Sequence, residues 1–211
     1  MSYTIKEIFY SLQGEGANSG KPAVFCRFSG CNLWNGREID RKHAKCNFCD
    51  TDFVGTDGVG GGSYNSAELL ATKINSFWPS SKQCNKFVIF TGGEPLLQLD
   101  RTLIKTLREL DFYIAIETNG TIPTFLDIDW VCVSPKHNNA LKIMEGNEIK
   151  IVFPQGNLDP EDYIHLNFEH KYLQPMDGNN LAENISKTID YVLSNPEWKI
   201  SLQSHKYIGI K

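Results

Sequence analysis

Residues 86–120, KFVIFTGGEPLLQLDRTLIKTLRELDFYIAIETNG, are the stretch that decides the fold. The apolar run KFVIF predicts a strand that ends at the glycine turn TGGEP. DRTLIKTLREL predicts a helix capped by Asp100 and buried through Leu103, Ile104 and Leu107, and FYIAIETNG predicts a second strand. A strand, a helix and a strand in this order are typical of parallel strands joined by a helical crossover.

The same alternation continues on both sides of this unit. Further strands are expected at 22–29, 130–136, 147–154 and 171–178, and a last strand with a short extension at 198–210. Helices are expected at 65–78, capped by Asn65 or Ser66, and at 179–196, capped by Asn180. The region 32–63 is expected to be irregular, with its glycine cluster GTDGVGGGS as a mobile loop. The pattern predicts one α/β domain, residues 1–211, with a parallel sheet or a partial (incomplete) parallel β/α barrel.

Charge and hydropathy exclude several classes of protein. The 211 residues carry a formal net charge of −4 and no long Lys/Arg run, which argues against binding nucleic acid through its phosphates. Lys6 and Glu7 stand where a signal peptide would carry an apolar run, and no apolar stretch approaches membrane-spanning length. We therefore expect a cytoplasmic protein with no nucleic-acid or membrane partner, in which thiols stay reduced.

Three of the six cysteines stand together in the segment CNLWNGREIDRKHAKCNFCD, residues 31–50. Cys26 and Cys132 lie in apolar strands and are expected to be buried free thiols, and Cys84 has no identifiable partner. Two kinds of metal site fit the remaining three thiolates. Zinc would take a fourth ligand, for which His43 is available. A 4Fe–4S cluster would keep one iron open for a substrate or cofactor.

Polar clusters follow the predicted strands at their C-terminal ends. These clusters are TGGEP, ETNG, SPK and QPMDG, and the cysteine segment follows the strand at 22–29 in the same way. Because the C-terminal ends of parallel strands meet at one edge of a sheet, we expect the clusters to form one site.

The pair CNFC and GGEP resembles the radical S-adenosylmethionine enzymes, although fourteen residues separate the first two cysteines where that superfamily usually has three. There the glycine turn meets the amino group of the cofactor, which the missing Cβ permits. A closer resemblance covers nearly the whole chain. The motifs IFYSLQGEG, FCRFSGCNLW, CDTDF, TGGEPLLQLD, IETNG, VSPK, QPMDG and HKYIGI occur in the order found in the 7-carboxy-7-deazaguanine synthases with an expanded cysteine loop.

This resemblance implies conversion of 6-carboxy-5,6,7,8-tetrahydropterin to 7-carboxy-7-deazaguanine with loss of ammonia, in 7-deazapurine (queuosine) biosynthesis. The implied cofactors are a 4Fe–4S cluster, S-adenosyl-L-methionine and Mg²⁺. The cluster would deliver an electron to S-adenosylmethionine, and the resulting 5′-deoxyadenosyl radical would take a hydrogen from the pterin. The implied partners are an electron donor such as a flavodoxin or ferredoxin, and a second copy of the chain in a homodimer.

The resemblance also assigns residues. The implied cluster ligands are Cys31, Cys46 and Cys49, and the Mg²⁺ ligand is Thr51. The implied S-adenosylmethionine site comprises Phe48, Cys49, Asp50, Gly93, Ser134, Pro135, Lys136, Gln174, Pro175, Met176 and Asp177. The implied substrate site comprises Leu12, Gln13, Gly14, Glu15, Arg27 and Thr91. We also expect Lys211 to reach the substrate through its terminal carboxylate, and Glu117 and His205 are candidates for proton transfer.

Two other functions remain open at this point. One is an activating enzyme that abstracts hydrogen from a glycine of a partner protein, and the other is a zinc-stabilised binding module without catalytic activity. Single residues have structural alternatives: a surface charge for Arg27, a cap for Thr51 and core packing for Met176.

Overall fold

The computed structural model describes residues 2–81, 84–124, 126–136 and 139–211. Within these residues one sheet has the strand order β3-β1-β2-β4-β5-β6-β7-β8-β9. The strands are β1 (Tyr3–Leu12), β2 (Pro22–Phe28), β3 (Gly62–Tyr64), β4 (Lys86–Gly92), β5 (Phe112–Thr118), β6 (Trp130–Val133), β7 (Glu145–Phe153), β8 (Asn167–Pro175) and β9 (Lys199–Ile200). From β2 to β9 all neighbours are parallel, whereas β1 is antiparallel to β2 and β3. The end strands β3 and β9 do not pair, so the sheet is a partial barrel, as predicted.

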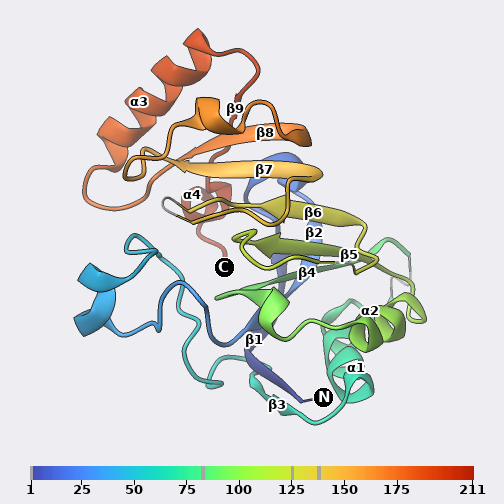
Figure 1. Ribbon diagram of the computed structural model, residues 1–211. Helices are drawn as coiled ribbons and strands as arrows, with labels where there is room; N and C mark the ends of the chain where they lie inside the picture. Colours follow the sequence, from blue (N-terminus) through green and yellow to red (C-terminus); the bar gives the residue numbers. More distant parts are fainter. Residues whose placement is uncertain (1, 82–83, 125, 137–138) are drawn as a thin grey trace.

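Four α-helices and four short 3₁₀ helices accompany this sheet in the described part of the chain. They are α1 (Ala67–Phe77), α2 (Arg101–Arg108), α3 (Leu181–Ser194) and α4 (Ser204–Ile208), with short 3₁₀ helices η1 (Gly16–Asn18), η2 (Glu38–His43), η3 (Pro95–Leu97) and η4 (Pro160–Tyr163). Figure 1 shows α1 and α2 on one side of the strands and the cysteine segment, in light blue, on the other. The capping residues Ser66 and Asp100 accept hydrogen bonds from the N–H groups of Leu69 and Leu103, as their positions predict.

Alternation along each strand separates the core from the inner face of the sheet. In β2, Val24, Cys26 and Phe28 are fully buried in the core, while Phe25 and Arg27 line the cavity described below. In β7, Ile149 and Ile151 belong to a second core cluster around Trp198. Because successive side chains of a strand point to opposite faces, this pattern directs one polar row into the interior of the partial barrel.

Several elements differ from the sequence-based predictions. Strand β1 was not predicted. Residues 62–64 of the region expected to be a mobile loop form β3, paired with Tyr3, Thr4 and Ile5 of β1. The expected last strand covers only Lys199–Ile200, and the residues after it form α4. Asn180 is the N-cap residue of α3, but its side chain makes no capping hydrogen bond. Among the described residues, none of the helices has the length and hydropathy that crossing a membrane requires.

Candidate active site

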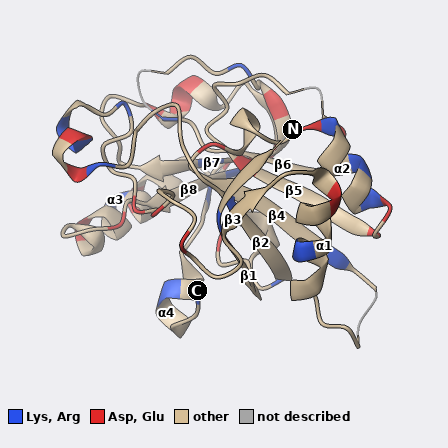
Figure 2. Cartoon of the chain, turned by 90° about the horizontal axis from the view of Figure 1, so that it is seen from below, with Lys and Arg blue, Asp and Glu red and all other residues tan. Residues whose placement is uncertain are grey.

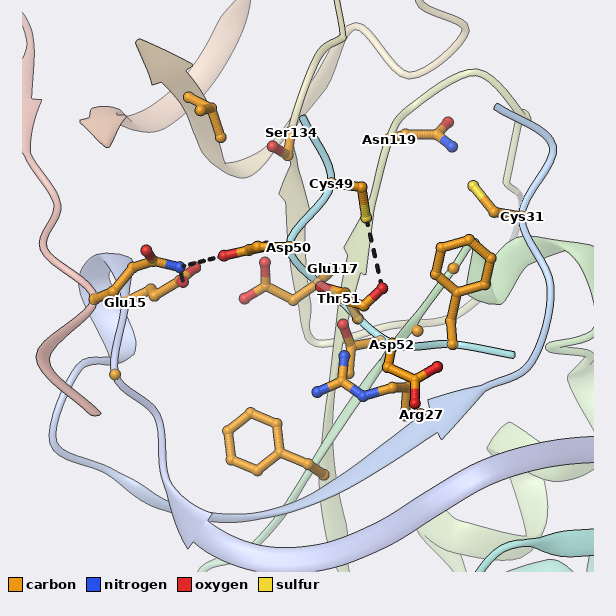
Figure 3. Close-up of a pocket in the computed structure, with 18 of the residues that line it drawn as sticks. Glu15, Arg27, Cys31, Cys49, Asp50, Thr51, Asp52, Glu117, Asn119 and Ser134 are labelled. Carbon is orange, nitrogen blue, oxygen red and sulfur yellow. Dashed lines mark hydrogen bonds between the residues drawn. The ribbon is translucent and has the colours of Figure 1, made fainter. Parts of the chain in front are cut away.

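A cavity of about 550 Å³ lies at the C-terminal ends of the parallel strands. The predicted site residues that line it are Leu12, Gln13, Gly14, Glu15, Arg27, Cys31, Cys46, Phe48, Cys49, Asp50, Thr51, Thr91, Gly93, Glu117, Ser134, Lys136, Gln174, His205 and Lys211. Pro135, Pro175, Met176 and Asp177 lie outside the lining. Figure 3 shows Cys31, Cys49 and Asn119 at one end of the cavity and Glu15 at the other, with Glu117 between them.

The cysteine segment is ordered by contacts of its own. The guanidinium of Arg41 donates to the backbone oxygens of Asn47 and Cys49, at 3.1 and 2.9 Å, and stacks 4.1 Å from the centre of the Trp34 ring. Trp34 in turn packs edge-on against Phe53. These contacts hold the expanded loop beside the cysteines that follow it.

The three thiols share one end of the cavity. The proximity of Cys46 lowers the pKa of Cys49 to about 6, and that of Cys49 raises the pKa of Cys46. Burial raises the pKa of Cys31. Thiolates are ligands for zinc and for iron–sulfur clusters. Among the described residues, no three His, Cys, Asp or Glu side chains converge as ligands of a single ion, and His43 is exposed.

A cluster places its cysteine ligands on separate iron atoms, whereas zinc draws its sulfur ligands within about 2.3 Å of one ion. The three thiols that line one cavity provide one sulfur ligand for each of three irons of a 4Fe–4S cluster.

The glycine turn after β4 closes on the start of the cysteine segment. A Cβ on Gly93 would lie 2.0 Å from the carbonyl oxygen of Gly30 and 2.8 Å from Cβ of Cys31. The missing Cβ thus permits a close approach to the cysteine segment, in addition to the predicted approach to a cofactor. Next in the turn, the buried carboxylate of Glu94 accepts from the backbone N–H of Asn119 at 2.8 Å. These contacts tie the ends of β4 and β5 to Cys31.

At the other end of the cavity, two carboxylates surround one ammonium group. Nζ of Lys150 lies 2.7 Å from Glu15 Oε2 and 3.0 Å from Glu117 Oε2. Nε2 of Gln13 donates to Glu117 Oε1 at 3.0 Å. Burial raises the pKa of Glu15, but the charge of Lys150 outweighs it, so the pKa lies below its ordinary value. Acceptor and donor groups here suit a polar, planar ligand.

Arg27 belongs to a second ion-pair group. Its Nε donates to Glu7 Oε1 at 2.9 Å, and Glu7 Oε2 also accepts from Nζ of Lys211. Burial raises the pKa of Glu7, yet Lys211 and Arg27 together hold that pKa below its ordinary value. Arg27 is therefore not a surface charge, because its side chain is only 18% exposed and faces the cavity. The terminal guanidinium nitrogens can form a two-pronged contact with a carboxylate.

The helix α4 lies against the glycine loop LQGEG, and its residues His205 and Lys206 line the cavity. Figure 2 shows this helix, with its lysine in blue, beside the C-terminus. Nζ of Lys206 pairs with Asp50 Oδ2 at 2.8 Å and with Asp177 Oδ2 at 2.6 Å. The ring of His205 lies against Gly14, where a Cβ would come within 2.1 Å of Nδ1. Segments far apart in the sequence are thereby held around one cavity.

Three residues of these ion pairs, Glu7, Lys150 and Lys206, were not predicted as part of the site. A signal was present for Lys150, because NEIKIVF places Glu148, Lys150 and Val152 on one face of a strand whose other face is apolar. A charged row on a strand inside an α/β sheet indicates a polar interior. No such signal marks Glu7, which lies in a strand that itself was not predicted, or Lys206.

Comparison with known proteins identifies the family. No model of a known protein family matches the chain. It is 53% identical over 210 residues to a 7-carboxy-7-deazaguanine synthase from Burkholderia multivorans and 54% identical over 210 residues to one from Bordetella pertussis, each covering 100% of both chains. A 7-carboxy-7-deazaguanine synthase from Haemophilus influenzae is 34% identical over 223 residues, covering 100% of this chain and 95% of its own.

A solved structure agrees with these relatives. The crystal structure of QueE from Escherichia coli superposes with a TM-score of 0.68 and 26% identity, covering 97% of this chain and 95% of that one. The chain therefore belongs to the 7-carboxy-7-deazaguanine synthase family of radical S-adenosylmethionine lyases, as its ordered motifs predict.

Proposed function

We propose that the chain converts 6-carboxy-5,6,7,8-tetrahydropterin to 7-carboxy-7-deazaguanine with loss of ammonia, using the site residues assigned above. The observation that carries the assignment is that one cavity gathers the three cysteines, the glycine turn, Arg27 and the loop LQGEG. These features lie far apart in the sequence. The cysteines and the glycine turn would serve S-adenosylmethionine, and Arg27 and the loop LQGEG would serve the pterin.

The cysteine end is the proposed cofactor site. Cys31, Cys46 and Cys49 would hold a 4Fe–4S cluster, which supplies the electron that cleaves S-adenosylmethionine. The S-adenosylmethionine contacts are assigned to Phe48, Cys49, Asp50, Gly93, Ser134, Lys136 and Gln174 of the cavity lining, and to Pro135, Pro175, Met176 and Asp177 outside it. Nζ of Lys136 donates to Ser134 Oγ at 2.7 Å and lies 6.0 Å from the centre of the Phe48 ring. This contact places a cation and an aromatic face beside the cysteines.

The carboxylate end is the proposed pterin site. Gln13 and Glu15 are suited to the amide and amine edge of the pterin, and Arg27 to its carboxylate. Thr51 and Thr91 also line the cavity, and a hydroxyl is a hard donor of the kind Mg²⁺ takes, so Thr51 remains the proposed Mg²⁺ ligand. We assign proton transfer to Glu117 and His205, which face the cavity from β5 and α4. Leu12, Gly14 and Lys211 complete the wall.

The remaining assignments concern the surroundings of the enzyme. We assign residues 1–211 to one domain, because a single sheet joins the first strand to the last. A homodimer is the proposed assembly of the enzyme. A flavodoxin or ferredoxin is the proposed electron donor. All six cysteines are free thiols, which suits the reducing cytoplasm.

Turnover by protein prepared without oxygen tests this function. The reaction contains S-adenosylmethionine, Mg²⁺, a chemical reductant and the carboxytetrahydropterin, and the products are identified by mass spectrometry. We expect the deazaguanine product from the natural chain and from the matched control Cys84→Ala, whose cysteine is exposed and outside the cavity. We expect none from Cys46→Ala. Cluster-loaded protein that cleaves S-adenosylmethionine but leaves the pterin unchanged would overturn the proposal and favour the activating enzyme.

A further inference from the structure

A buried lysine joins the two carboxylates at the substrate end of the cavity. Lys150 lies on β7 with 3% of its surface exposed, and its Nζ contacts one oxygen each of Glu15 and Glu117. Two carboxylates that share a buried site disfavour each other's charge, and a cation between them offsets this repulsion. The lysine therefore balances the charge of the two carboxylates that contact it.

The other oxygens of the same carboxylates are held as well. Gln13 Nε2 donates to Glu117 Oε1 at 3.0 Å, and Gln203 Nε2 donates to Glu15 Oε1 at 3.0 Å. Each carboxylate is thus fixed in orientation from both ends. Since an ionised carboxylate has about four lone-pair sites, each can still accept a hydrogen bond from a ligand.

We propose that Lys150 is a positioning residue for the substrate: its ammonium group holds the carboxylates of Glu15 and Glu117 in fixed orientations, so that they accept hydrogen bonds from the N–H groups of the pterin ring. This inference rests on the proposed function, because it takes the pterin as the ligand of this end. Lys150 itself acts through the two carboxylates and donates no proton to the substrate.

Charged and titratable groups approach Lys150 from several elements. They are Glu15 after β1, Glu117 on β5, Cys132 on β6 and Glu148 on β7, and His205 of α4 faces Glu15. Burial raises the pKa of Glu148, and the charge of Lys150 opposes this rise. Loss of the lysine charge would raise the pKa of Glu15, so that Glu15 ionises only at higher pH. Activity that needs ionised Glu15 would then start at a higher pH.

The test compares three variants of the holoenzyme. Lys150→Met removes the charge at similar length, Lys150→Arg keeps it, and Lys171→Met removes a lysine of the neighbouring strand that lies outside the cavity. For each, kcat and KM for the carboxytetrahydropterin are measured from about pH 5.5 to 9, and Tm is measured alongside. A glutamate with an ordinary or lowered pKa stays ionised over this range, so only a raised pKa gives an acid limb within it.

We expect Lys150→Met to lower kcat/KM about a hundredfold, as misplaced binding groups do, with a raised KM and an acid limb moved to higher pH. Lys150→Arg should keep the acid limb of the natural chain, and Lys171→Met should match the natural chain throughout. A Lys150→Met enzyme with lowered Tm but unchanged KM and acid limb would overturn the inference. If Lys150→Met does not fold, an acid limb in Lys150→Arg that moves to higher pH overturns it instead. A natural chain that makes no product contradicts the proposed function, whereas product from every variant alike contradicts only the role of Lys150.

Discussion

The contact between the glycine turn and the cysteine segment makes Gly93→Ala a sharp test of the site. The new Cβ would lie 2.0 Å from the Gly30 carbonyl oxygen, and real contacts of this kind are essentially absent below 3.0 Å, so the two segments must separate by at least 1.0 Å. Overpacking of this kind costs about 1–3 kcal/mol. For a chain of this length that lowers Tm by about 2–12 °C.

The same displacement moves Cys31, whose Cβ lies next to the new methyl group. Loss of support around a metal ligand typically lowers metal affinity about 10- to 100-fold. After reconstitution without oxygen, we expect Gly93→Ala to lose iron to a chelator at concentrations that leave the natural chain loaded.

The matched control is Gly146→Ala on β7, outside the cavity, where a Cβ would meet the Phe168 ring at 3.0 Å. It should lower Tm without loss of iron. Gly93→Ala protein that is destabilised but retains iron as the natural chain does would refute the reasoning that the turn positions Cys31.

Three further predictions concern the ion pairs and the C-terminal helix. Glu7→Gln should destabilise the chain by about 2 kcal/mol at neutral pH. Because the pKa of Glu7 is lowered in the folded state, this loss of stability should be complete above pH 4.5 and should shrink as the pH falls below that value. Urea unfolding at several pH values measures the loss. A loss that does not depend on pH would contradict the ion pair. Gly14→Ala should lower Tm because the new methyl group would clash with the His205 ring. Adding His205→Ala should restore most of the lost Tm. Equal losses of Tm in the single and double variants would argue against the contact. Lys206→Met should lower Tm by only about 2–4 °C, since its partly exposed ion pairs contribute about 1 kcal/mol. A loss above about 10 °C in a thermal scan would contradict this estimate of the ion pairs.

The central strands and helices could be predicted because each carries a local signal. KFVIF and FYIAI are apolar runs, and Ser66 and Asp100 form the caps that their side chains predict. Strand β1 gave no such signal, because Lys6 and Glu7 interrupt its apolar residues. Glu7 faces the cavity and pairs with Arg27. A strand that lines a polar site loses the apolar alternation by which strands are recognised.

Site residues that belong to sequence motifs could be assigned from the sequence, whereas residues that belong to the site through their ion-pair partners could not. CNFC, TGGEP and LQGEG carry family patterns, so their residues could be assigned. Lys150 and Lys206 form ion pairs with carboxylates that lie 29 to 156 residues away in the sequence. Such pairs become visible only when the fold brings the strand ends together. The same reason explains α4, whose few residues close on Gly14 instead of extending the sheet.

The most direct test of the central claim, that three cysteines hold an iron–sulfur cluster in this cavity, is metal analysis of protein prepared without oxygen. Iron, sulfide and zinc are measured per chain, for the natural sequence, Cys46→Ala and the control Cys84→Ala. We predict about four irons with matching sulfide in the natural chain and in the control, and their loss in Cys46→Ala. About one zinc and no iron, even after reconstitution, would contradict the account.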